Sequence, residues 1–260
     1  MSNHLVAADL KVRLGVRQVL DGVSVAFEPG CVNVIIGPNG AGKSTLLACL
    51  AGLRRPDAGG VTLNGASVTA IPLRQRAQRL ALLPQQTEIA WPIDVRTLVG
   101  LGRIPHQGPF GARAEDHAAV DRALLATGLE DMAARKAPTL SGGERSRALI
   151  ARALAGAPDW ILADEPMTGL DPRHALDAAD LFRRLAGEGM GVILTLHDLN
   201  LAARMADRVV VIREGQVMAD GAAGDVVNPD VINRVYGIDF AHLGPIPEVA
   251  TGSATGLPHN

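Results

Sequence analysis

This sequence lacks a set of cysteines, an apolar run of membrane-spanning length and a surplus of either charge. Its only cysteines among 260 residues, Cys31 and Cys49, are too few for a disulfide framework and have no metal-binding spacing. We expect both to be reduced thiols. No uncharged apolar run approaches the roughly 18 residues of a membrane helix, and the N-terminus shows no basic segment followed by an apolar one. We therefore expect a soluble, cytosolic chain.

The charges nearly balance, because 25 Lys and Arg stand against 27 Asp and Glu, for a net charge of −2. A dedicated nucleic-acid-binding protein usually carries a basic surplus, so we expect no nucleic-acid partner. The length suits one large α/β domain or one domain with an inserted lobe.

Short β-rich runs alternate with helical segments, which predicts an α/β fold with a mainly parallel sheet and helices packed on it. Near-continuous apolar runs predict strands buried on both faces, at residues 32–37, 160–164, 191–196 and 208–213. Capping signals predict helices at residues 43–52, 144–155, 173–187 and 198–206. Antiparallel strands are expected at residues 5–14 and 18–27, and a late hairpin near residues 213–221.

The middle of the chain differs from the rest. From about residue 86 to 140 few β-branched residues occur, and residues 115–128 have helical spacing. We predict one domain over residues 1–240, with a core of residues 1–85 and 141–240 and an inserted helical subdomain at about 86–140. The tail, residues 241–260, is rich in Gly, Pro, Ala and Thr, and we expect part of it to be flexible.

Residues 37–44, GPNGAGKS, match the phosphate-loop pattern G-x-x-x-x-G-K-[ST] without a mismatch, between a predicted strand and a predicted helix. Backbone N–H groups of such a loop surround phosphate oxygens, and the helix N-terminus adds positive partial charge. Lys43 reaches the β- and γ-phosphates, and the Ser44 hydroxyl can bind Mg²⁺. The alternative is a glycine-rich turn that holds no anion. The predicted nucleotide-binding residues are Gly37, Pro38, Asn39, Gly40, Ala41, Gly42, Lys43, Ser44 and Thr45.

Two carboxylates follow the predicted strand at residues 160–164. Asp164 ends the strand, where it can reach Mg²⁺ directly or through water. Glu165 lies one residue beyond and can polarise an attacking water. The alternative is an acidic turn at the end of a strand. A kinase uses a similar pair, so these motifs predict only a phosphate-loop NTPase.

The segment LSGGE, residues 140–144, separates the classes. Ser141 and Glu144 form a capping box at a helix start. Gly142 and Gly143 lie in the first turn, where each costs roughly 1 kcal/mol of helix stability. This cost indicates that something approaches the backbone closely, and a helix N-terminus with a hydroxyl is a second anion site. The plainer interpretation is a cap and nothing more.

In chain order, these motifs resemble the nucleotide-binding subunit of ABC transporters, over practically the whole chain to about residue 239. Gln85 in LLPQQ resembles the Q-loop glutamine, residues 167–171 (MTGLD) the D-loop, and His197 in TLHDLN the switch histidine. The resemblance implies ATP and Mg²⁺ as cofactors, with the metal held by Ser44, Gln85 and Asp164. It implies catalytic roles for Glu165, His197 and Gln85.

The family's subunits pack head to tail, so that the LSGGE helix of one protomer caps the γ-phosphate held by the other. The resemblance thus implies a homodimer in which Ser141, Gly142 and Gly143 contact nucleotide and Asp171 links the two sites. Plainer readings remain for three residues. Asp171 before a proline can be only a helix cap, and His197 can be structural. Gln85 can be a loop amide, and the neighbouring Gln86 leaves the register open.

Two positions depart from the family pattern. Members usually place an aromatic ring about 29 residues before the phosphate-loop lysine, but here that position is Leu14, with no aromatic nearby. Loss of a stacked ring forfeits roughly 1–3 kcal/mol, so the preference for adenine over guanine is left open. Ala163 replaces a larger aliphatic residue, and we expect little consequence.

Residues 93–108 contain LGRIPH and resemble the importer subgroup that handles iron chelates, haem and cobalamin, as do residues 226–239. Arg103, Pro105 and His106 carry this match; the plainer reading is that Pro105 ends a helix and the rest is surface. We expect an ATPase that powers import of a ferric siderophore or haem, with a cobalamin importer or, less favoured, an exporter as alternatives.

The implied partners are two integral-membrane permease subunits and, indirectly, a periplasmic substrate-binding protein. The chain would then lie at the cytoplasmic face of the inner membrane. Two rival classes share the phosphate loop and LSGGE. Chromosome-maintenance ATPases carry coiled-coil or zinc insertions between them, and the gap here lacks heptads and cysteine pairs. Ribosome-associated ABC proteins normally carry two cassettes, and this chain has one.

Overall fold

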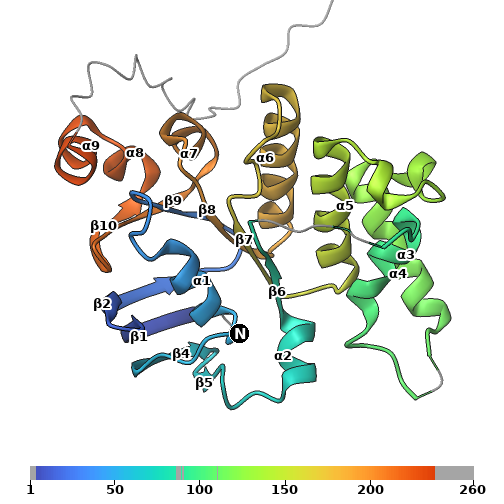
Figure 1. Ribbon diagram of the computed structural model, residues 1–260, viewed down its shortest axis with the longest axis horizontal. Helices are drawn as coiled ribbons and strands as arrows, with labels where there is room; N and C mark the ends of the chain where they lie inside the picture. Colours follow the sequence, from blue (N-terminus) through green and yellow to red (C-terminus); the bar gives the residue numbers. More distant parts are fainter. Residues whose placement is uncertain (1–3, 86–88, 90, 110, 238–260) are drawn as a thin grey trace, which may run out of the picture.

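Two sheets and a group of helices make up the chain in a computed structural model that describes residues 4–85, 89, 91–109 and 111–237 (Figure 1). Gln86 and residues 241–260 lie outside the described residues. The strands are β1 (Leu5–Leu14), β2 (Arg17–Phe27), β3 (Val32–Ile36), β4 (Ala58–Leu63), β5 (Ala66–Ser67), β6 (Leu80–Leu83), β7 (Trp160–Asp164), β8 (Gly191–Thr195), β9 (Arg208–Arg213) and β10 (Gln216–Ala222). The α-helices are α1 (Lys43–Leu50), α2 (Leu73–Arg79), α3 (Val95–Gly100), α4 (Ala114–Thr127), α5 (Gly142–Ala155), α6 (Pro172–Gly187), α7 (Leu199–Met205), α8 (Ala223–Val226) and α9 (Pro229–Tyr236).

The central sheet has the strand order β10-β9-β3-β8-β7-β6, and only β9 and β10 pair antiparallel in it. The N-terminal sheet, β2-β1-β4-β5, is antiparallel throughout. The predicted α/β fold with a mainly parallel sheet is therefore confirmed. Strands β4, β5 and β6 and helix α2 had not been predicted.

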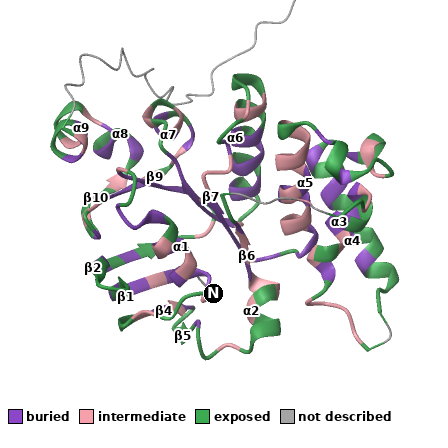
Figure 2. Ribbon diagram, in the orientation of Figure 1, coloured by how far each residue is buried: buried purple, intermediate pink, exposed green. Residues whose placement is uncertain are grey.

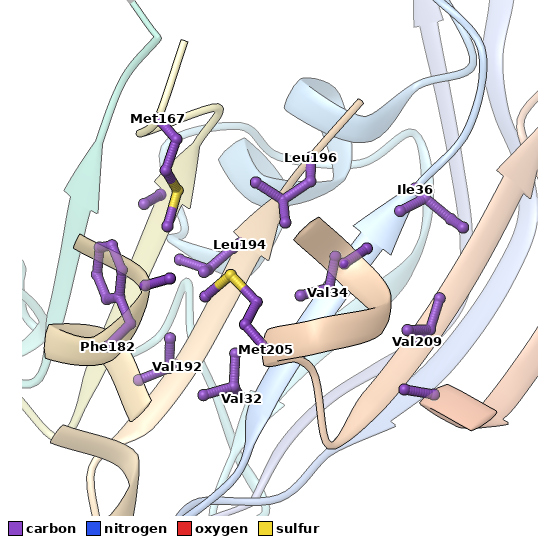
Figure 3. Close-up of a cluster of buried hydrophobic side chains, with 14 of the residues drawn as sticks. Val32, Val34, Ile36, Met167, Phe182, Val192, Leu194, Leu196, Met205 and Val209 are labelled. Carbon is purple, nitrogen blue, oxygen red and sulfur yellow. The ribbon is translucent and has the colours of Figure 1, made fainter. Parts of the chain in front are cut away.

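The central strands bury both faces, which explains their continuous apolar runs. In β7, Trp160 and Leu162 pack with α1 and the antiparallel sheet. Ile161 and Ala163 point the other way, into a cluster with α6, α7 and α9. Figure 3 shows this second cluster, where Phe182 and Met205 cover valines and leucines of β3 and β8. The two apolar clusters, one on each face of the central sheet, thus hold its strands in place.

Helices α3, α4 and α5 form a body with its own apolar cluster at one end of the molecule (Figure 1). The faces that they turn toward one another are buried (Figure 2). Helix α5 belongs to two clusters, because Ala148, Ala151 and Ala155 pack in the helical body and Ile150 packs against the central sheet. Helix α5 is therefore the joint between the two parts.

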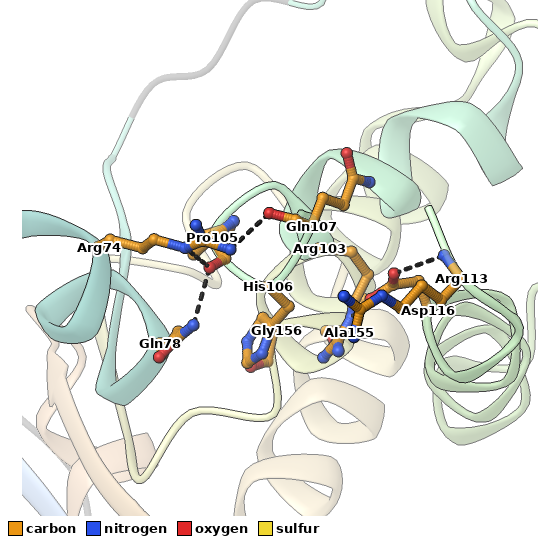
Figure 4. Close-up of polar contacts among 10 residues, drawn as sticks. All are labelled: Arg74, Gln78, Arg103, Pro105, His106, Gln107, Arg113, Asp116, Ala155 and Gly156. Atoms are coloured by element: carbon orange, nitrogen blue, oxygen red, sulfur yellow. Dashed lines mark hydrogen bonds and ion pairs between the residues drawn. The ribbon is translucent and has the colours of Figure 1, made fainter. Parts of the chain in front are cut away.

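Residues 102–106, with the sequence GRIPH, make a set of polar contacts at this joint, which we call the polar clip (Figure 4). Arg103 is buried, and its Nε donates to Asp116 Oδ1 at 2.8 Å while its Nη1 donates to the carbonyl of Ala155 at 3.0 Å. His106 Nε2 lies 2.8 Å from the carbonyl oxygen of Gly156. The reading of these residues as mere surface is wrong, because their polar groups face the C-terminal end of α5.

Pro105 faces the other partner of the clip, α2. Its carbonyl accepts from Arg74 Nε and from Gln78 Nε2, each at 2.7 Å. Gly102 lies so close to α5 that a Cβ there would be 1.9 Å from the carbonyl oxygen of Arg152. The segment therefore ties α2, beside the central sheet, to the end of α5.

No helix in the described part of the chain is long and apolar enough to cross a membrane. Within the same residues, no cluster of three or more His, Cys, Asp or Glu side chains could hold a metal ion.

Candidate nucleotide-binding site

The phosphate loop joins β3, at the middle of the central sheet, to α1. Gly37 has φ 153°, and a Cβ there would lie 2.0 Å from the carbonyl oxygen of Ile212. Gly42 has φ 108°, and its Cβ would lie 2.7 Å from Leu20 Cδ2. Only glycine fits either position, since both the backbone angle and the space exclude a side chain. The loop is thus pinned against two neighbouring strands, β9 and β2.

Lys43, the first residue of α1, is buried, and its Nζ donates to the carbonyls of Gly37 at 2.7 Å and Pro38 at 3.2 Å. Burial lowers the pKa of Lys43, and the nearby Glu165 and Asp164 act against that shift. The ammonium is held inside the curve of the loop by two acceptors that phosphate oxygens can replace.

A hollow of about 820 Å³ opens in front of this loop. One end is lined by Leu14, Arg17 and Val19 of the antiparallel sheet. The other end is lined by Gln85, Glu165 and His197. Between the two ends lie Asn39, Gly40, Gly42, Lys43, Ser44 and Thr45. The structure therefore brings residues from five separate segments of the chain to one cavity.

Asp164 and Glu165 leave β7 at the carboxyl edge of the sheet, next to Thr195 of β8. The Thr195 hydroxyl donates to Asp164 Oδ1 at 2.6 Å and accepts from the backbone N–H of Glu165 at 2.9 Å. Glu165 has a left-handed backbone with φ 49°, which is strained for a residue other than glycine. One buried hydroxyl thus holds both acidic positions, and sequence reasoning missed it because Thr195 lies inside an apolar run.

The carboxylate of Glu165 gathers three polar side chains. Its Oε2 accepts from Gln85 Nε2 at 2.7 Å and from Thr168 Oγ1 at 3.1 Å, and it lies 3.7 Å from His197 Nδ1. The Glu165 side chain is only 14 % exposed, whereas that of His197 is 61 % exposed. Gln85, Glu165 and His197 therefore lie together in the structure, and Thr168, from the segment MTGLD at residues 167–171, joins them without having been predicted as a site residue.

The LSGGE helix, α5, starts with a complete capping box. Ser141 Oγ accepts from the backbone of Glu144 at 3.3 Å, and Glu144 Oε2 accepts from the backbone of Ser141 at 2.7 Å. The bond from the Ser141 backbone lowers the pKa of Glu144. The cap leaves the Ser141 side chain exposed at the surface.

The two glycines of LSGGE have different surroundings. A Cβ on Gly143 would lie 2.9 Å from Cγ of His174, so the close neighbour of this glycine comes from α6 of the same chain. A Cβ on Gly142 would meet only the carbonyl of Gly169, at 3.8 Å. Gly143 is explained within the chain, and the exposed Gly142 is not.

Asp171 caps α6 and also binds the ring that covers Gly143. Its Oδ1 accepts from the His174 backbone N–H at 3.0 Å, and its Oδ2 lies 2.5 Å from His174 Nδ1. These contacts with His174, the backbone bond first, lower the pKa of Asp171. Asp171 therefore has the predicted capping role, through a histidine that sequence reasoning missed.

The LSGGE residues do not reach the hollow of their own chain. No residue from 140 to 144 is among the described residues that line it. Gly142 instead lines a separate cavity of about 310 Å³ together with Gln85, Arg145 and Glu165. Ser141 and Gly142 are therefore exposed and lie outside the hollow that the phosphate loop lines.

The comparisons with known proteins identify the family. The sequence pattern of the family described as ABC transporter matches residues 20–168. The chain is 39 % identical over 254 residues to the hemin import ATP-binding protein of Bordetella avium, across 95 % of this chain and 96 % of that one. It is 41 % identical to the cobalamin import ATP-binding protein of Halobacterium salinarum, across 96 % of this chain and 62 % of that one. It is 37 % identical to the iron(3+)-hydroxamate import ATP-binding protein of Bacillus subtilis, across 91 % and 89 %.

Solved structures share the fold. The match to an inward-facing structure described as of the metal-chelate type of ABC transporter has a TM-score of 0.81 at 25 % identity, over 92 % of this chain and 90 % of that one. A dimeric ATP-binding cassette in a post-hydrolysis state with ADP and phosphate has a TM-score of 0.74 at 25 % identity, over 84 % and 98 %. The chain therefore belongs to the ABC transporter family, as one of its ATP-binding, ATP-hydrolysing proteins.

Proposed function

We propose that this chain powers an importer of metal chelates, with a ferric siderophore or haem as cargo and cobalamin as the second candidate. The support is the near-full-length likeness to ATP-binding proteins named for import of hemin, cobalamin and iron(3+)-hydroxamate. Recognition of the cargo would fall to the partner subunits.

We assign a part to each residue of the site, supported by these contacts. The loop N–H groups, the α1 N-terminus and Lys43 hold the triphosphate. Glu165 is the general base that takes a proton from the attacking water. Gln85 and Thr168 orient its carboxylate, and His197, at the open end, is placed to contact the γ-phosphate.

Mg²⁺ fits the donor set at this end of the hollow. Ser44, Asp164 and Gln85 offer a hydroxyl, a carboxylate and an amide oxygen, and Mg²⁺ prefers such oxygen ligands. Gln85 donates through its nitrogen to Glu165, which leaves its amide oxygen for the metal. When bound, the ion would neutralise charge on the phosphates.

Two copies of the chain must meet head to tail to complete the site. The observation that carries this proposal is the exposed start of α5, where Ser141 and Gly142 line no part of the hollow of their own chain. Placed against the phosphate loop of a second copy, this helix start would bring its N–H groups to the γ-phosphate. Asp171 lies beside the same surface and would link the two sites.

The remaining partners follow from importer function. Two permease subunits in the inner membrane would bind this dimer at the cytoplasmic face. A periplasmic substrate-binding protein would then deliver the cargo.

Glu165→Gln tests the catalytic assignment. The amide keeps the shape and the Gln85 contact region but cannot take a proton, so ATP turnover should fall by about 10²–10⁴. The variant should collect as an ATP-bound dimer in light scattering after size exclusion. Lys43→Ala is the matched control, because it should lose ATP affinity and stay monomeric. Unchanged hydrolysis by Glu165→Gln would contradict the assigned base.

Capture from detergent-solubilised membranes tests the partners. The tagged Glu165→Gln chain, loaded with ATP, should retain a polytopic permease. Vesicles that hold the same permease with the wild-type chain should accumulate haem, a ferric hydroxamate or cobalamin when ATP is supplied on the side of this chain, and vesicles with the Glu165→Gln chain should not. Export of cargo, or capture of ribosomes or nucleic acid instead, would overturn the proposal.

A further inference from the structure

One face of the β1–β2 hairpin lines part of the hollow. Leu14 and Arg17 are opposite each other in the antiparallel register, on either side of the turn. Val19 lies two residues after Arg17 and therefore on the same face of β2. All three side chains line the hollow, next to Gly40 and Gly42 of the phosphate loop. They form one wall beside the triphosphate site.

The guanidinium of Arg17 is fixed to the phosphate loop. Its Nη2 donates to the carbonyl of Gly40 at 3.2 Å and packs 3.3 Å from where a Cβ of Gly40 would be. Among the described residues Arg17 forms no ion pair with a carboxylate, so no neighbouring negative charge neutralises its guanidinium. A planar cation is thus held at the rim between the loop and the hairpin.

A bound nucleotide must place its base at this wall. Its phosphates would occupy the loop and the N-terminus of α1, with the γ-phosphate toward Gln85, Glu165 and His197. The base then extends away from these three residues, toward the hairpin that lines another part of the hollow. No aromatic side chain lines the described hollow, so a ring is not there to stack on it.

We propose that Arg17 stacks on the base of the bound nucleotide, with Leu14 and Val19 as the apolar floor beside it. Guanidinium groups stack well on flat π systems. Every purine has such a face, and stacking does not read the polar edge of the base. The chain therefore binds ATP and GTP with affinities that differ by only a few fold. This inference rests on the proposed nucleotide site.

Competition binding of MgATP and of inorganic triphosphate with Mg²⁺ tests the contact, because triphosphate has no base. Arg17→Ala should weaken ATP by about tenfold and leave the affinity for triphosphate within twofold. Arg13→Ala is the matched control: Arg13 is on the same hairpin and bonds Gln18 instead of lining the hollow. It should leave both affinities unchanged.

A second variant restores a stacking group by other means. Leu14→Tyr added to Arg17→Ala places a ring on the same face and should recover most of the lost ATP affinity. Equal weakening of ATP and triphosphate by Arg17→Ala would overturn the inference in favour of a phosphate contact. Unchanged ATP binding by Arg17→Ala, or no recovery with the tyrosine, would overturn it as well. A wild-type chain that binds neither ligand would instead refute the proposed nucleotide site.

Discussion

Gly142→Ala should raise the stability of the free chain and abolish its activity. Gly142 is the first residue of α5 and is exposed, and an added Cβ would meet only an ordinary contact at 3.8 Å. Replacing glycine by alanine at such an unstrained helical position stabilises a protein by about 0.4–1 kcal/mol. The same methyl would stand between the helix start and the γ-phosphate held by a partner subunit. Loss of such phosphate donors should cost about 10²–10³ in turnover.

Two measurements on one preparation of Gly142→Ala test whether stability rises while ATPase activity falls. Urea unfolding should show a raised midpoint for Gly142→Ala, and steady-state ATPase assays should show the loss of turnover. Gly187→Ala is the matched control, since Gly187 ends α6 on the exposed side with no atom within 4 Å of an added Cβ. It should raise stability by a similar amount and leave hydrolysis unchanged.

Gly143→Ala separates the two glycines of the motif. Its Cβ would lie 2.9 Å from the ring of His174, which must move away from Asp171 to make room. This variant should therefore gain less stability than Gly142→Ala, or lose some.

Normal hydrolysis by Gly142→Ala would refute the reasoning that its open face receives a phosphate from a second copy.

Two further predictions concern the interior. Arg103→Ala breaks a buried ion pair with Asp116, and it should lower the free energy of unfolding about three times more than Arg96→Ala does. The pair of Arg96 with Asp121 has the shorter distance of 2.6 Å but is half exposed. Equal shifts of the urea midpoint in the two variants would contradict the structural role assigned to residues 102–106. Burial raises the pKa of Cys49 to about 11. The unfolded chain therefore loses the thiol proton at a lower pH than the folded chain, and the free energy of unfolding should fall as pH rises from about 9 through 11. A Cys49→Ala variant whose thermal unfolding midpoint falls just as steeply with pH would count against this.

The sequence alone predicted the phosphate loop and determined the alternation of strands and helices and the order of the motifs. The phosphate loop can be recognised in the sequence because consecutive residues supply the backbone that surrounds the phosphates. The glycines and Lys43 must therefore be close neighbours in the chain. The central strands are legible because burial on both faces leaves continuous apolar runs. Glu165 was readable for the same reason, since it directly follows such a run.

The tertiary structure alone decided which groups from distant segments support those residues. Thr195 holds Glu165 from 30 residues away, His174 occupies the space that Gly143 leaves, and Arg103 is buried against the end of α5. The pairing of Leu14 with Arg17 became a wall of the hollow only when the hairpin packed beside the phosphate loop. Single hydroxyls and cations in such contacts leave no periodic trace in a sequence, because their partners are set by how sheets and helices pack and not by chain spacing.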